Sequence, residues 1–147
     1  MINHIKTLFN RLMEEDIPKK EIDFETALAA LLVEVMRADG EVKVAEINKI
    51  HSILLKECGL DGQASDNLIE KAKTLVEEAI DLFSFVTVIN EHTSDVERID
   101  IIELLWHVAL ADDEIDGIEE HIIRKIAGLM YVAHADFIAA KLAVVKS

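Results

Sequence analysis

The sequence predicts an all-α fold, a compact bundle of seven or eight helices with an internal pseudo-twofold repeat. Three observations carry this prediction. Half of the 147 residues are hydrophobic (51%) and only one proline and five glycines interrupt them, a composition that favours helices over strands. Apolar residues recur at helical spacing along most of the chain. Two segments, which begin at Leu31 and Leu104, are near-copies of each other, and an internal repeat indicates related structural units.

The first half of the chain contains four predicted helices. Pro18 ends the first of them, and Gly59 is a natural stop for the third. Between the second and the third lies the turn Asp39-Gly40-Glu41. Residues 61–65 form the most loop-like segment, so we expect the fourth helix only after it. Periodic apolar residues place these helices at about residues 1–15, 20–38, 47–54 and 68–80.

The second half contains three or four more. Residues 83–89 would also suit a strand, but a lone strand has nothing to pair with, so we predict a short helix. Ser94 and Glu97 form a capping-box signature that opens the next helix, which runs through Leu110 and is apolar nearly all round. We expect this helix to be the most buried one. The last two are predicted at about 118–130 and 134–145. One domain, 1–147, then holds repeat halves at about 20–60 and 94–130.

The charge of the chain limits its partners. A formal net charge of −14 repels nucleic acid phosphates and anionic lipid headgroups, so we predict no nucleic acid partner. No apolar stretch reaches the roughly 20 residues that a membrane span needs. The N-terminus lacks the pattern of a signal peptide, and Cys58 is the only cysteine, which fits a reducing compartment. We therefore expect a cytoplasmic protein that attracts cations or a basic partner.

The repeat carries carboxylates at matched positions, Asp39 and Glu46 in the first copy and Asp112 and Glu119 in the second. Each aspartate continues the apolar stripe of the helix before it. A carboxylate held there must meet backbone donors or a cation, because burying it bare is costly. The spacing resembles the back half of an EF-hand calcium loop, but the front-half ligands are missing. A cation would therefore need ligands from both copies at once.

Two interpretations of these carboxylates stay open. Capping and turn geometry alone could explain them, since Asp116 and Glu119 form a capping-box signature in the second copy. In the first copy Lys43 stands at the matching position; it is a poor cap and leaves Glu46 unexplained. The other interpretation is one divalent-cation site, with calcium favoured because every ligand is a hard oxygen. Its predicted metal ligands are Asp39, Glu46, Asp112 and Glu119.

The pattern as a whole resembles the tellurite resistance TerB family. A helix that ends in Ala-Asp, then an acidic turn, an aliphatic residue and a glutamate, occurs at residues 36–46 and again at 105–119, and the Asp136-Phe137 segment is similar to that family's closing helix. The resemblance spans about Phe24 to Lys141. It implies an all-helical, pseudo-symmetric fold, and a role in resistance to tellurite and related stress with partner proteins at the inner face of the membrane. The family's acidic residues, suspected as a cation site, fall on the four carboxylates named above. Asp113 replaces a family glycine, which predicts an altered second turn.

The sequence shows little catalytic equipment. It has no glycine-rich phosphate loop, no redox cysteine pair and no zinc-protease His-Glu-x-x-His motif, so we predict no catalytic residue and a non-enzymatic protein. The leading functional prediction is a cytoplasmic TerB-like stress and tellurite-resistance module with a divalent-cation site, acting with a protein partner in a membrane-associated complex. The alternative is a metal-free interaction domain that docks a basic partner. A metal-dependent hydrolase is disfavoured, because no lysine, arginine or serine is common to both turns.

Overall fold

The chain folds into eight α-helices, and no strand occurs in the part of the chain that the computed structural model describes, residues 3–14, 22–78, 81–114 and 116–145. The all-α prediction is confirmed. A short π-helical turn, η1 (Ile53–Glu57), continues the third helix. The helices are α1 (Asn3–Glu14), α2 (Phe24–Arg37), α3 (Val44–Ser52), α4 (Gly62–Glu77), α5 (Leu82–His92), α6 (Asp95–Ala109), α7 (Gly117–Leu129) and α8 (His134–Val145).

Local capping signals decide where several helices begin. The expected helix over residues 83–89 is confirmed as part of α5, whose N-cap Asp81 accepts a hydrogen bond from the Ser84 amide at 2.9 Å. The predicted loop at 61–65 is wrong. Asp61 is the N-cap of α4 and accepts a hydrogen bond from the Ala64 amide at 2.8 Å, so the helix starts one residue later. The predicted stop at Pro18 lies outside the described residues.

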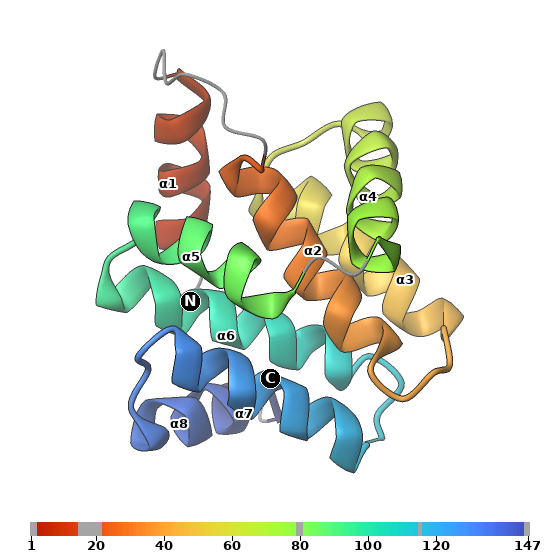
Figure 1. The fold of residues 1–147 in the computed structure, drawn as a ribbon, viewed down its shortest axis with the longest axis vertical. Helices are drawn as coiled ribbons and strands as arrows, with labels where there is room; N and C mark the ends of the chain where they lie inside the picture. Colours follow the sequence, from red (N-terminus) through yellow and green to blue (C-terminus); the bar gives the residue numbers. More distant parts are fainter. Residues whose placement is uncertain (1–2, 15–21, 79–80, 115, 146–147) are drawn as a thin grey trace.

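Two helices, α2 and α6, form the centre of the bundle (Figure 1). Helix α2 packs against α4, α5 and α6, and α6 packs in addition against α8, α1, α3 and α7. Both are buried nearly all round, as predicted for α6, where Ile101, Leu105 and Trp106 have no exposed surface. Because α2 and α6 are in contact, the two halves of the repeat share one hydrophobic core. Whether the halves superpose as wholes stays a prediction.

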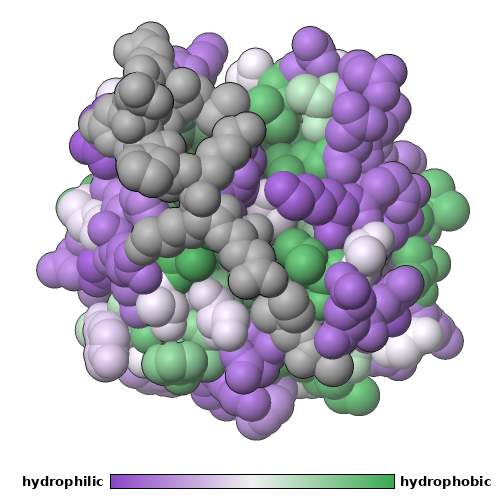
Figure 2. All heavy atoms as spheres, turned by 45° about the horizontal axis from the view of Figure 1, so that its top comes forward, coloured by the Kyte–Doolittle hydropathy of each residue, from purple (hydrophilic) through white to green (hydrophobic). Residues whose placement is uncertain are grey.

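The surface separates polar from apolar side chains in the usual way. Figure 2 shows hydrophilic side chains over the outer face of α4, where Gln63, Asp66 and Glu70 are exposed. Among the described residues, none of the helices has the length and apolar character required to cross a bilayer. Each of the eight described helices contributes buried hydrophobic residues to a common core.

Candidate functional site

The two acidic turns, residues 39–46 and 112–119, begin with the same local hydrogen bond. The Asp39 carboxylate accepts from the Glu41 amide at 3.0 Å, and the Asp112 carboxylate accepts from the Glu114 amide at 3.2 Å. Each aspartate therefore closes an Asx-type turn directly after a central helix. The turn provides a hydrogen bond to one oxygen of each carboxylate, and the second oxygen is left for other partners.

The backbone of the two turns also matches at the next residue. Gly40 has a φ of 81° and Asp113 has a φ of 64°, so both lie in the left-handed region. The prediction that Asp113 alters the second turn is wrong at the level of the backbone, because aspartate tolerates this conformation better than most residues. The two turns keep a common geometry although only one of them contains glycine.

The two acidic turns lie side by side. The loop after α2 and the loop after α6 meet at the lower right of Figure 1, and the Lys43 ammonium nitrogen is 3.0 Å from an Asp112 carboxylate oxygen and 3.9 Å from one of Asp39. Lys43 thus connects the first turn to the second. As expected of a poor cap, its side chain makes no capping hydrogen bond to α3. Sequence reasoning did not predict its role as a bridge.

The two glutamates of the repeat lie deeper. Glu46 and Glu119 are 0% and 1% exposed, and apart from each other their carboxylates have no hydrogen-bond partner among the described residues. The expected capping box at Asp116 is only half formed. Asp116 caps α7 by accepting from the amides of Ile118 and Glu119 at 2.7 and 3.3 Å, but the Glu119 carboxylate is buried instead of returning to the Asp116 amide. Capping therefore does not account for Glu119.

The charges around Glu46 and Glu119 favour one proton shared by the two carboxyls. Burial raises the pKa of Glu119 to about 9, and the neighbouring Glu46 and Asp39 carboxylates contribute to that rise. Burial also raises the pKa of Glu46, while a hydrogen bond with Glu119 and the charge of Lys43 counteract the rise. Two carboxyls that cannot both ionise in a buried place share a proton. At neutral pH the pair thus carries about one negative charge instead of two.

Lys43 has the opposite effect on its partner Asp112, whose pKa it lowers. The hydrogen bond from Lys43 is the main cause that lowers the pKa of Asp112, and the same bond raises the pKa of Lys43 above its ordinary value. Asp112 and Lys43 are therefore both charged over the whole physiological range. We call the six converging residues the acidic cluster: Asp39, Lys43, Glu46, Asp112, Asp116 and Glu119.

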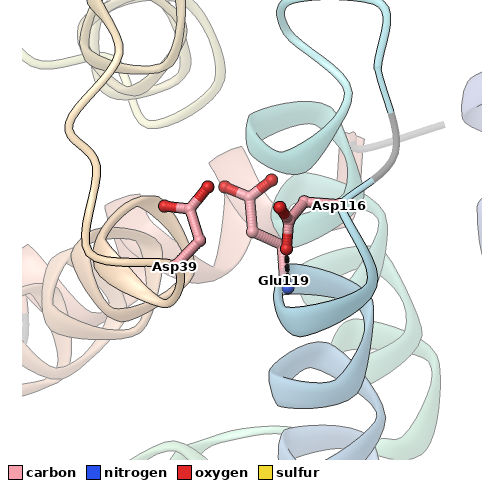
Figure 3. A group of neighbouring side chains, drawn as sticks. All are labelled: Asp39, Asp116 and Glu119. Carbon is pink, nitrogen blue, oxygen red and sulfur yellow. Dashed lines mark hydrogen bonds between the residues drawn. The ribbon is translucent and has the colours of Figure 1, made fainter.

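One part of the acidic cluster has metal-ligand geometry. Asp39, Asp116 and Glu119 each offer a carboxylate oxygen, and these three atoms lie within 4.8 Å of one another. Figure 3 shows the three side chains facing one another across the gap between the loop after α2 and the start of α7. Calcium binds oxygen at 2.3–2.6 Å, so two of its ligands lie about 5 Å apart at most. The spacing of the three oxygens fits one such ion.

The structure places the four predicted ligands together but adds a fifth carboxylate. Asp39 and Glu119 belong to the triad, Glu46 adjoins Glu119, and Asp112 is held by Lys43. Sequence reasoning treated Asp116 only as a cap and missed its place in the triad. The signal was present, because Asp116 occupies in the second copy the position that Lys43 occupies in the first. The role of all these residues as ligands stays a prediction.

Comparison with known proteins gives one finding. The family model described as "Tellurite resistance protein TerB" matches residues 25–142, which is most of the chain and includes both acidic turns. No curated protein and no solved structure matches the chain. The matched range agrees closely with the part of the chain in which the repeated pattern resembles that family. The chain therefore belongs to the tellurite resistance protein TerB family.

Proposed function

We propose that this protein is a non-enzymatic TerB module whose acidic cluster binds a divalent cation, with calcium as the favoured ion. The observation that carries the proposal is the pair Glu46 and Glu119, both fully buried and with no hydrogen-bond partner among the described residues other than each other. Buried polar groups in native proteins are nearly always paired. Beside this pair, Asp39 and Asp116 present further oxygens within ligand distance.

The energetics of the acidic cluster support a cation more than a purely structural role. Five carboxylates converge there, and within the cluster the Lys43 ammonium is the one positive charge. Carboxylates this close repel one another unless protons or cations neutralise them. A proton shared by Glu46 and Glu119 supplies part of this neutralisation. A divalent cation with oxygen ligands would supply the rest, and hard oxygens are the donors that calcium prefers.

The wider role follows from the family to which the chain belongs. We propose a function in resistance to tellurite and related stress, in the cytoplasm, together with a protein partner in a membrane-associated complex. Binding of a cation would change the local charge of the surface at which the two acidic turns meet. A change of this kind can alter the affinity for a charged partner. On this proposal the cation modifies a docking surface and takes part in no reaction.

The alternative is an interaction domain that uses its acidic surface without any metal. The net charge of −14 supports it, since such a surface attracts basic segments at long range. A basic partner would neutralise exposed carboxylates first. It would leave Glu46 and Glu119 with only each other as partners, because neither side chain reaches the surface. The buried pair therefore favours the cation over the basic segment.

Titration calorimetry on the chelator-treated protein tests the proposal. Calcium, magnesium, manganese and zinc chloride are each titrated into the wild-type chain and into the Asp39→Asn, Glu46→Gln and Glu119→Gln variants. We expect calcium to bind and to raise the melting temperature by mass action. Asp39→Asn should weaken binding at least tenfold. Glu119→Gln, which removes an oxygen of the triad, should weaken it at least as much as Glu46→Gln.

Glu120→Gln is the matched control for these titrations. Glu120 follows Glu119 on α7, but its carboxylate pairs with the Lys141 ammonium at 2.7 Å, outside the acidic cluster. Its loss should leave cation binding unchanged. Thermal melts of each variant, recorded beside the titrations, separate weakened binding from lost folding. A wild-type chain that binds none of the four cations, or variants that all bind like the wild type, would overturn the proposal and favour metal-free docking.

A further inference from the structure

We infer that the acidic cluster contains two matched half-sites, of which one is open to a divalent cation and the other is filled by the Lys43 ammonium of the chain itself. This inference rests on the proposed function and adds to it a stoichiometry of one ion per chain. The chain would then contain two matched half-sites but bind only one ion.

The register of the repeat defines the two half-sites. Positions 39, 43 and 46 of the first copy correspond to 112, 116 and 119 of the second. The triad with metal-ligand spacing takes its first aspartate from one copy and its other two residues from the other copy, as Asp39, Asp116 and Glu119. Exchanging the copies gives the second half-site, Asp112, Lys43 and Glu46.

The backbone supports the correspondence between positions 43 and 116. Lys43 is the N-cap of α3 with φ −94° and ψ 138°, and Asp116 is the N-cap of α7 with φ −89° and ψ 130°. Two residues with the same place at a helix start and the same backbone angles direct their side chains in a similar way. One of them ends in a carboxylate that joins the triad, and the other ends in an ammonium.

The ammonium lies where the second half-site needs a positive charge. Its nitrogen is 3.0 Å from the Asp112 carboxylate, and its charge also acts on the fully buried Glu46, whose carboxylate has no hydrogen-bond partner among the described residues other than Glu119. An ammonium is a compact point charge with three donors, so at this position it pairs with Asp112 directly and acts on Glu46 through its charge.

The charges of the two half-sites therefore differ. The open half-site has three carboxylates and only a longer contact with the ammonium, 3.9 Å from Asp39, whereas the filled half-site has two carboxylates and the ammonium at 3.0 Å from Asp112. A divalent ion that entered the filled half-site would have two carboxylates for ligands in place of three and would be repelled by the lysine. Binding at the open half-site leaves the bond between Lys43 and Asp112 in place. One ion per chain is the expected result.

Replacing Lys43 tests the inference directly. Native mass spectrometry and calcium calorimetry count the ions bound by the full chain in its wild-type, Lys43→Asp and Lys43→Asn forms. We expect one calcium ion for the wild type and two for Lys43→Asp. Lys43→Asn keeps the chain folded by supplying a good N-cap without adding a charge, and we expect it to bind a second ion more weakly. Lys56→Asp, an exposed lysine in η1, is the control with the same charge change and should bind one.

The outcomes separate this inference from the proposed function. One ion in the wild type and also in both Lys43 variants would overturn the inference and leave the proposed function standing. Two ions in the wild type would overturn the inference as well, and so would a second ion in Lys56→Asp, because charge alone would then create the site. No ion in the wild type would overturn the proposed function and this inference with it.

Discussion

Replacing Glu119 by glutamine should remove a pH dependence of folding that the wild-type chain shows between mildly acidic and mildly basic pH. Burial and the neighbouring Glu46 and Asp39 raise the pKa of Glu119 to about 9. An unfolded glutamate has a pKa of about 4.3. Between these two values the folded chain holds a proton that the unfolded chain has released. Stability is therefore greatest near the lower value and falls as the pH rises toward the upper one.

The size of this effect follows from one bound proton. A difference of one proton between the folded and unfolded states changes the free energy of unfolding by about 1.4 kcal/mol per pH unit at most. The full limit is not reached, because water at the edge of the acidic cluster, where the Asp39 side chain is 7% exposed, screens part of the charge that raises the pKa of Glu119. Some of the bound proton is then released before pH 8. We expect about 1 kcal/mol per pH unit, hence a loss of about 2 kcal/mol from pH 6 to pH 8.

Urea unfolding, followed by circular dichroism at pH 6, 7 and 8 with a chelator present, measures this slope. In Glu119→Gln the amide can donate to Glu46 without titrating, so the difference between variant and wild type should grow by about 2 kcal/mol over this range. Glu120→Gln is the control. Its hydrogen bond with Lys141 lowers the pKa of Glu120, so this carboxylate is ionised from pH 6 to pH 8. The free energy of unfolding of Glu120→Gln should therefore change with pH as it does in the wild type. Equal slopes in Glu119→Gln and the wild type would refute the shared proton.

Three further predictions concern the backbone and the single cysteine. Gly40 has a φ of 81° with free space around its Cα, so Gly40→Ala should lower the free energy of unfolding by about 1 kcal/mol from backbone strain alone. At the matching position, Asp113→Gly should raise it by about 0.5 kcal/mol. Chemical unfolding measures both, and no change in either variant would contradict the matched turns. Tyr131 combines a φ of 60° with 84% exposure, so Tyr131→Gly should raise the free energy of unfolding by about 1 kcal/mol, and a loss would show that the ring makes contacts of its own. Burial raises the pKa of Cys58 to about 12, so an aromatic disulfide reagent should label it only as fast as the chain unfolds, and rapid labelling of the folded protein would disprove the buried thiol.

Hydrophobic periodicity predicted the helices better than their ends. It placed α8 correctly at both ends and identified α5 as a helix, because a lone strand would have had no partner. It missed the start of α4, where the apolar stripe begins only at Leu68 although the helix begins at Gly62. Periodicity reports where a helix is packed against a core. A first turn that lies in solvent is instead set by its cap, here Asp61.

The sequence allowed us to predict which residues form most of the acidic cluster, but not how their side chains are arranged in space. The repeat identified Asp39, Glu46, Asp112 and Glu119 because each stands at a matched place beside an apolar stripe. The bridge from Lys43 and the inward position of the Asp116 carboxylate depend on how the loop after α2 faces the loop after α6. That arrangement is set by tertiary packing of the two central helices, which no local pattern encodes.

The bridge between the two turns has a consequence for what a single chain can build. In a symmetric homodimer each residue beside the axis occurs twice, so a lysine on one side requires a lysine on the other. Here both turns belong to one polypeptide, and the matched positions hold Lys43 and Asp116. Such a pair can be unequal, and a bound ion can then lie closer to one turn than to the other. Joining both turns in one chain thus permits an asymmetric site that two identical subunits could not form.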